Sequence, residues 1–240
     1  MDTLDTTHPQ DEESLARASV REAYYTFAGT PFLERVDEAF VASLLADELI
    51  SALELMTKEE GFNSDFAEGL SLMLHYLESA KQREISTVAD ELGVDRTRLF
   101  RGVAQGYGPP PPLETLWTGP EKRENATLQQ LAAEYRDARK DPSFDTQERL
   151  DYLGVELRYL ISLVQDEKTR LQEGDAAGAR EMLAKQYEFL ARHLCSWAPR
   201  YIETALPEAK TSFYQGHLTF LRGLLTSDQE FLQDTLTPKT

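Results

Sequence analysis

Hydrophobic residues recur every three or four positions over most of the chain, which is the spacing of one face of an α-helix. Glycine and proline separate the periodic segments, and runs of β-branched residues are scarce. The pattern predicts an all-α, multi-helix bundle of about nine to ten helices. The expected helices cover residues 11 to the stop at 29–31, 40–56, 66–77, 127–138, 145–173, 182–194 and 207–232.

The segment ISTVADELGVDRTRLF, residues 85–100, carries two short helical patterns. We expect a short helix, a turn at Gly93 and a second helix capped by Asp95, an order that resembles a helix-turn-helix. DNA binding is disfavoured all the same, because the acidic chain would repel phosphates.

Four consecutive prolines, Pro109 to Pro112, lie in the stretch GYGPPPPLETLW. Proline fixes its own φ and moves the preceding residue out of the α region, so this run is extended and cannot lie inside a helix. We call residues 102–120 the strap. It divides the chain into a flexible tail (1–10), an N-terminal helical group (11–104), a Gly/Pro hinge (105–121) and a C-terminal helical group (122–240).

The chain is strongly acidic, with 42 Asp and Glu against 25 Lys and Arg and a formal net charge of -17. Such a field repels nucleic acid and anionic membranes and favours basic partners. The alternative is a solvated surface that keeps the protein soluble. Cys195 is the one cysteine, which favours a reducing compartment. The chain has no recognisable signal peptide and no apolar stretch of membrane-spanning length, so we expect a cytoplasmic location without stable membrane insertion.

No sequence pattern for catalysis or metal binding stands out. The histidines are His8, His75, His193 and His217, and none has HExxH spacing. His193 and Cys195 are two residues apart, a spacing that places them on different sides of a helix and favours core packing over a zinc site. Phosphate-binding, dinucleotide-binding and GxSxG motifs are absent from the sequence. We therefore expect no enzyme, no catalytic residue and no metal site.

One helical strip offers a candidate binding surface. Tyr152, Val155 and Tyr159 follow one another along a helix beside its leucine stripe, with Asp151 and Glu156 close by. Aromatic rings give contact area at low entropic cost, and a carboxylate can bind an arginine, so the strip could line a peptide groove. The alternative is that the tyrosines only pack and Asp151 is solvated.

The strap and its surroundings resemble a motif of the TorD/DmsD/NarJ family, which are cytoplasmic chaperones for maturing molybdenum oxidoreductases. The family pattern RLF-x-G…PP-x-ES-x-Y is similar to the stretch RTRLFRGVAQGYGPPPPLETLWTG. The matching residues are Arg98, Leu99, Phe100, Gly102, Pro111, Pro112 and Glu114, with Thr115 and Trp117 in place of the usual serine and tyrosine.

Three further segments resemble the same family. LARASVREAYYTFAGTPF is similar to its first helix, in which an arginine precedes a tyrosine and a short loop. The patterns D-H-x-x-x-E-L and HL-x-x-W-x-P look like Asp151, Tyr152, Glu156 and Leu157, and like His193, Leu194, Trp197 and Pro199. The motifs occur in the family's order, and the similarity covers roughly residues 14–232.

The resemblance implies a TorD-like fold, with the strap as the hinge between two helical groups. It also implies a function: relatives bind the N-terminal leader of a catalytic subunit, often a twin-arginine signal, and hold the apoenzyme until its molybdenum cofactor is inserted. The partner would be that subunit, and the cofactor would belong to the client rather than to this chain. Some relatives exchange domains across the hinge, so the chain would be a monomer or a domain-swapped dimer.

The resemblance and the strip together predict the leader-binding residues. They are Tyr24, Tyr25, Leu99, Phe100, Pro112, Glu114, Trp117, Asp151, Tyr152, Glu156 and Trp197. Asp151 and Glu156 would pair with leader arginines, and Pro112, Trp117 and Tyr152 would supply apolar walls. The family histidine implicated in leader binding and in a weak GTP interaction is Tyr152 here, which lacks a titratable imidazole and weakens the GTP prediction.

Two other functions stay open from the sequence. One is an acidic helical scaffold or regulatory protein that recognises no leader. The other is a weak nucleotide hydrolase that uses acidic residues and a metal.

Overall fold

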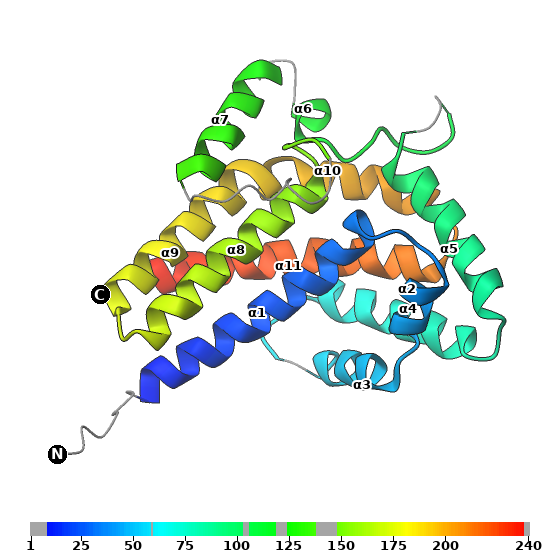
Figure 1. Ribbon diagram of the computed structural model, residues 1–240, viewed down its shortest axis with the longest axis horizontal. Helices are drawn as coiled ribbons and strands as arrows, with labels where there is room; N and C mark the ends of the chain where they lie inside the picture. Colours follow the sequence, from blue (N-terminus) through cyan, green and yellow to red (C-terminus); the bar gives the residue numbers. More distant parts are fainter. Residues whose placement is uncertain (1–8, 59, 103–105, 119–123, 138–147, 238–240) are drawn as a thin grey trace.

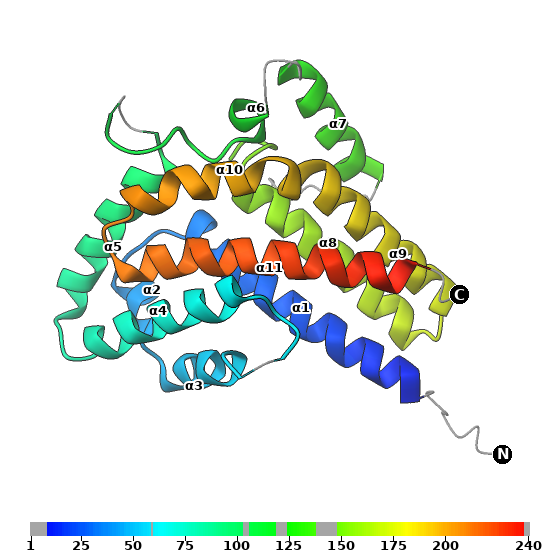
Figure 2. The ribbon, with the colours of Figure 1, turned by 180° about the vertical axis from the view of Figure 1, so that it is seen from behind.

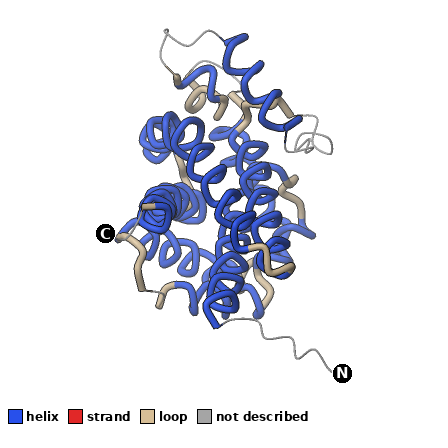
Figure 3. The backbone as a smooth tube through the Cα atoms, turned by 90° about the vertical axis from the view of Figure 1, so that its left-hand side faces the viewer, coloured by secondary structure: helices blue, strands red, loops and turns tan. Residues whose placement is uncertain are grey.

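The computed structural model describes residues 9–58, 60–102, 106–118, 124–137 and 148–237. Among them it shows helices and loops and no strand, as Figure 3 shows, so the all-α prediction is confirmed. The helices are α1 (Pro9–Leu33), α2 (Glu38–Leu44), α3 (Asp47–Met56), α4 (Ser64–Ala80), α5 (Ile85–Phe100), α6 (Glu114–Trp117), α7 (Glu124–Asp137), α8 (Leu153–Gln172), α9 (Ala176–Phe189), α10 (Cys195–Ala205) and α11 (Ser212–Leu236).

Helix α11 occupies the middle of the bundle. It lies between α4 on one side and the α9–α10 pair on the other, and α1 packs against α8 (Figures 1 and 2). Helices α4 and α11 approach closely because Gly69 and Gly216 face each other at their crossing. A Cβ added at Gly216 would lie 2.5 Å from the carbonyl oxygen of Gly69. Helices from before and after the strap therefore share one core, and the predicted division into two groups at the hinge stays a prediction.

Helix α1 runs past the predicted glycine and proline stop at residues 29–31 and ends at Leu33. Pro31 lies in its last turn, where the backbone carbonyls need partners from outside the helix. Buried Arg96 of α5 supplies them, with Nε donating to the carbonyl of Pro31 at 2.9 Å and Nη2 to that of Phe32 at 2.6 Å. A tertiary contact therefore extends the helix beyond its sequence signal.

The helix-turn-helix prediction is wrong. Residues 85–100 form the single helix α5, which continues through Gly93. Asp95 does not cap a second helix there. Its carboxylate instead accepts hydrogen bonds from the backbone N–H groups of Lys210 and Thr211, at the start of α11. A long-range cap has replaced the expected local one.

Two other boundaries differ from the prediction. The segment 40–56 is two helices, α2 and α3, because the chain turns at Leu45 and Ala46. Helix α8 begins at Leu153 rather than near residue 145, since Asp151 and Tyr152 pair with the strap. The predicted turn and helix start at 141–147 lie outside the described residues.

The described part of the strap is non-helical up to Leu113, as the prolines predict, and then forms the short helix α6. Its loop passes close to α5: Gly108 has φ +126°, and a Cβ there would collide with the carbonyl oxygen of Arg98. A π-helical turn, Leu190–Leu194, joins α9 to α10, and Pro199 lies inside α10. No helix in the described part of the chain is long and apolar enough to cross a membrane.

Candidate functional site

The strap is fastened to the start of α8 by backbone hydrogen bonds. The N–H of Leu153 donates to the carbonyl of Pro112 at 3.0 Å, and the N–H of Glu114 donates to that of Asp151 at 2.9 Å. Leu113 and Tyr152 form an isolated antiparallel bridge at the same place. We call this contact of residues 111–117 with α8 and α10 the strap junction. It brings two separate family-like motifs together.

Asp151 holds the start of α6 at the strap junction. Its fully buried carboxylate accepts hydrogen bonds from the Thr115 hydroxyl at 2.6 Å and from the Thr115 N–H at 3.3 Å. Arg149 pairs with the same carboxylate at 2.9 Å. Asp151 therefore caps and anchors α6 in this structure.

A buried histidine in the π-helical turn, His193, lies between two carboxylates. Nδ1 of His193 lies 2.7 Å from Glu114 of α6, and Nε2 lies 3.3 Å from Glu134 of α7. Burial lowers the pKa of His193, but the two carboxylates outweigh burial, so the net shift is upward. Burial raises the pKa of Glu134, but hydrogen bonds from His193, Gln130 and Arg192 outweigh the effect of burial, so the net shift is downward. Both shifts favour an imidazolium between carboxylates.

Glu156 and Trp197, both assigned to leader binding from the sequence, are partners in the interior. The indole N–H of Trp197 donates to Oε2 of Glu156 at 3.1 Å, and both side chains are fully buried. The hydroxyl of Tyr152, also buried, donates to the carbonyl of Phe32 at 3.0 Å and so connects the strap junction to the end of α1.

The remaining predicted residues divide between the junction and the core. Trp117 is half-buried at the junction and donates its indole N–H to the carbonyl of Pro111. Leu99 and Phe100 are buried at the end of α5. Tyr24 and Tyr25 lie farther along α1, buried against α4 and α11. Ten of the eleven predicted residues are thus buried, and their assignment to leader binding stays a prediction.

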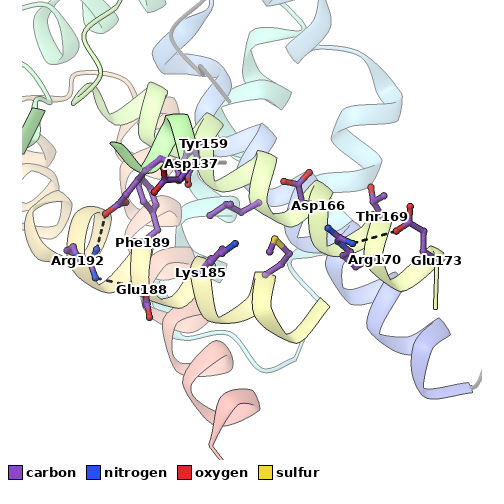
Figure 4. A pocket seen from close by; sticks show the side chains of 13 residues that line it. Asp137, Tyr159, Asp166, Thr169, Arg170, Glu173, Lys185, Glu188, Phe189 and Arg192 are labelled. Atoms are coloured by element: carbon purple, nitrogen blue, oxygen red, sulfur yellow. Dashed lines mark hydrogen bonds and ion pairs between the residues drawn. The ribbon is translucent and has the colours of Figure 1, made fainter. Parts of the chain in front are cut away.

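A groove of about 560 Å³ opens beside the strap junction, between α7, α8 and α9 (Figure 4). Its apolar floor consists of Tyr159, Leu163, Met182 and Phe189, and the rings of Tyr159 and Phe189 pack edge to face at 4.7 Å. Tyr159 belongs to the strip singled out in the sequence, whereas the other members of that strip, Tyr152 and Val155, are buried away from the groove.

Carboxylates outnumber cations around this groove. The acidic lining residues are Glu134, Asp137, Asp166, Glu173 and Glu188, and the basic ones are Arg170, Lys185 and Arg192. Each of these three cations has a carboxylate within 3.2 Å, as Arg192 has in Glu134 at 2.9 Å. The groove therefore combines an apolar floor with a negative rim, which suits an apolar peptide that carries basic residues.

The groove was missed from the sequence because three helices contribute to it. A signal was present on α9, where Met182, Lys185 and Phe189 recur at helical spacing, but that pattern is equally typical of a core helix. A second hollow of about 540 Å³, between α1 and α2, is lined by Phe27, Phe40 and other mainly apolar residues. We favour the acidic groove, because Glu134 connects it to the strap junction through His193.

No cluster of three or more His, Cys, Asp or Glu side chains that could hold a metal ion occurs within the described residues. A family model described as "Nitrate reductase delta subunit" matches residues 59–203. The match covers 145 residues, including the described strap, the groove-lining residues and His193. No curated protein and no solved structure matched the chain.

Proposed function

Because the chain belongs to the nitrate reductase delta subunit family, the NarJ/TorD-like chaperones of molybdoenzyme maturation, we propose that it binds the leader and apo form of a molybdenum oxidoreductase catalytic subunit. It holds that subunit until the cofactor has been inserted and export can follow. It acts by binding, without catalysing a reaction, and the molybdenum cofactor stays with the client. We place this action in the cytoplasm. The chain acts as a monomer or a domain-swapped dimer, and GTP is at most a weak ligand.

The leader binds in the groove between α7, α8 and α9. This location is supported by the lining of the groove, in which a rim rich in carboxylates surrounds an apolar floor of Tyr159, Leu163, Met182 and Phe189. An apolar leader segment covers the floor, and its arginines pair with rim carboxylates. The net charge of -17 attracts such a basic leader over a longer range.

The motif residues of the strap junction lie outside the lining of this groove and are connected to it through His193 and Glu134. Glu114, Asp151, Glu156 and Trp197 are buried and bonded within the protein, so a leader could touch them only if the strap moved away. Their role is to hold the strap and the ends of α8 and α10 in place.

A pull-down from the native host under anaerobic growth tests the function. Recovery of one molybdenum-enzyme catalytic subunit supports the proposal and identifies the client. Failure to recover any such subunit from cells that express one contradicts it.

Calorimetry with the client's leader peptide tests the location. Asp137→Lys places a positive charge on the groove rim, and Glu48→Lys makes the same change at an exposed position of α3. Both variants alter the net charge by two, so long-range attraction changes equally. We expect Asp137→Lys to weaken binding by about tenfold, equivalent to one close charge contact, and Glu48→Lys to change it less than twofold. Equal effects of the two variants would place the leader elsewhere.

A further inference from the structure

His193 stands between the groove and the strap. Its imidazole is buried, with one nitrogen 2.7 Å from Glu114 of the strap and the other 3.3 Å from Glu134. Glu134 is the outermost member of this array, because its side chain is 22% exposed and lines the groove. A ligand in the groove can therefore reach Glu134, and through it can affect the charge on His193.

Glu134 already shares its carboxylate among several donors. Arg192 donates to it at 2.9 Å and Gln130 at 3.1 Å, in addition to the contact with His193. Arg192 is half exposed on the groove rim and Glu134 itself is partly exposed there, so a second guanidinium, from the leader, can reach Glu134 alongside Arg192 without entering the core.

Other titratable groups surround the array on several helices. Tyr135 of α7 lies within the field of Glu114, Glu134 and Glu156. Helix α8 contributes Tyr159 and Glu156, which accepts a hydrogen bond from Trp197 of α10, and α9 contributes Glu188 beside Arg192. From α11, Asp228 acts on the neighbouring Cys195, whose pKa burial and this carboxylate raise to about 12. Among these groups, His193 is the one whose ordinary pKa lies close to neutral pH.

We propose that His193 couples the binding of a basic leader to the strength of its own hydrogen bond with Glu114 of the strap. A leader guanidinium that takes the Glu134 carboxylate adds a positive charge beside the imidazolium and removes one of its two partners. His193 then gives its proton to solvent, and its charge-assisted hydrogen bond to Glu114 becomes a weaker neutral one. The strap junction loosens when the groove fills. The same linkage makes protonation of His193 oppose binding of the cation.

This inference rests on the proposed function, and one calorimetric experiment separates the two. The probe is a synthetic apolar 20-residue peptide with two adjacent arginines, compared with an analogue in which both are glutamine. Titrations at pH 7 in phosphate and in Tris, which differ in ionisation enthalpy, give the number of protons released per peptide. We expect release of up to one proton with the arginine peptide and none with the glutamine analogue. Affinity for the arginine peptide should rise about fivefold or more from pH 6 to pH 8.

Two variants and one further readout show whether the proton comes from His193. His193→Gln removes the titrating group, and Glu134→Gln leaves His193 in place but removes the carboxylate at the groove; both should abolish proton release. Amide exchange at Glu114 and Leu153, whose N–H groups fasten the strap, should quicken on binding in the unaltered protein and not in Glu134→Gln. Binding without proton release overturns the inference alone. No binding by the unaltered protein overturns the proposed function as well.

Discussion

Trp197 and Glu156 are hydrogen-bonded partners inside the protein, with the indole N–H 3.1 Å from the carboxylate and both side chains fully buried. They come from two segments 41 residues apart in the sequence, each of which resembles a family motif. A buried carboxyl group has lost its hydrogen bonds to water, so removing a donor inside the protein destabilises the folded state.

Replacing Trp197 by Phe should therefore be strongly destabilising. The substitution removes a donor to a fully buried carboxyl group and leaves a small cavity, and we expect the free energy of unfolding to fall by about 2–4 kcal/mol. Urea denaturation at pH 7 measures this loss. Trp117→Phe is the matched control, because that half-buried indole donates to the neutral carbonyl of Pro111; its loss should be about 1 kcal/mol. Equal losses at the two tryptophans would contradict the larger contribution expected from the buried contact with Glu156.

The crossing of α4 and α11 should not tolerate a methyl group at Gly69. An added Cβ would collide with the backbone N of Phe220 and lie 2.5 Å from the carbonyl oxygen of Gly216. We expect Gly69→Ala to lower the free energy of unfolding by about 1–3 kcal/mol, since backbone atoms cannot move aside cheaply. Thermal unfolding monitored by circular dichroism gives the change.

Gly93→Ala is the control for that substitution. Gly93 lies inside α5, and its added Cβ would have no neighbour closer than Val36 O at 4.0 Å. Alanine is the better helix former, so this variant should be more stable by about 0.5–1 kcal/mol. A loss of stability at Gly93 would mean that α5 is interrupted there.

Asp95 should contribute to stability through α11 rather than through its own helix. Its carboxylate accepts from the N–H groups of Lys210 and Thr211 and from the Thr211 hydroxyl, which lie 115 and 116 residues away in the sequence. Asp95→Ala leaves these donors without their acceptor and should lower the free energy of unfolding by about 3 kcal/mol. Asp90→Ala, on the exposed face of α5, should change it by no more than about 0.5 kcal/mol. Similar losses in urea denaturation would argue against the long-range cap.

His217 should make the protein sensitive to acid. Burial lowers the pKa of His217 to about 4, although the backbone hydrogen bond to Ala28 opposes that shift. His217 becomes protonated below about pH 6.5 in the unfolded chain but only below about pH 4 in the folded protein. Between these values the unfolded chain binds more protons, so the free energy of unfolding falls as the pH falls. The loss due to this group is about 3 kcal/mol.

The difference in unfolding free energy between the unaltered protein and His217→Gln, measured from pH 7 to pH 4, isolates that contribution. It should shrink steadily as the pH falls, and a constant difference would contradict a buried neutral imidazole. His193 has the opposite effect on how stability changes with pH. Its pKa is raised in the folded state, so its contribution is present below about pH 6.5 and is lost as the pH rises through the folded-state pKa.

Local patterns predicted most of the helices, and two of the errors come from long-range contacts. Gly29 and Gly93 are typical stop signals, yet α1 and α5 run through them because Arg96 holds the end of α1 and because nothing near Gly93 requires a turn. Asp95 was expected as a local cap and serves a distant helix. At the end of α1 and at Asp95, a partner far along the sequence outweighed a local preference of about 1 kcal/mol, whereas at Gly93 the helix simply continues.

The candidate site could be predicted only in part. Tyr159 was recognised as a residue that could line a groove, but Glu134 and Phe189 were not, because their helices show ordinary core spacing and the groove exists only where three helices meet. His193 matched a family motif, yet nothing in the sequence indicated that Glu114, 79 residues earlier, would lie 2.7 Å from it.

The sequence by itself determined the helical class, the extended strap, the acidic field and the resemblance to the chaperone family, because periodicity, proline geometry, charge and motif order are all local or summed properties of the chain. The tertiary structure alone decided which motif residues are buried, which carboxylate meets which donor, and where a groove opens. Those outcomes depend on how helices pack, and packing brings together residues whose separation along the chain carries no signal of their contact.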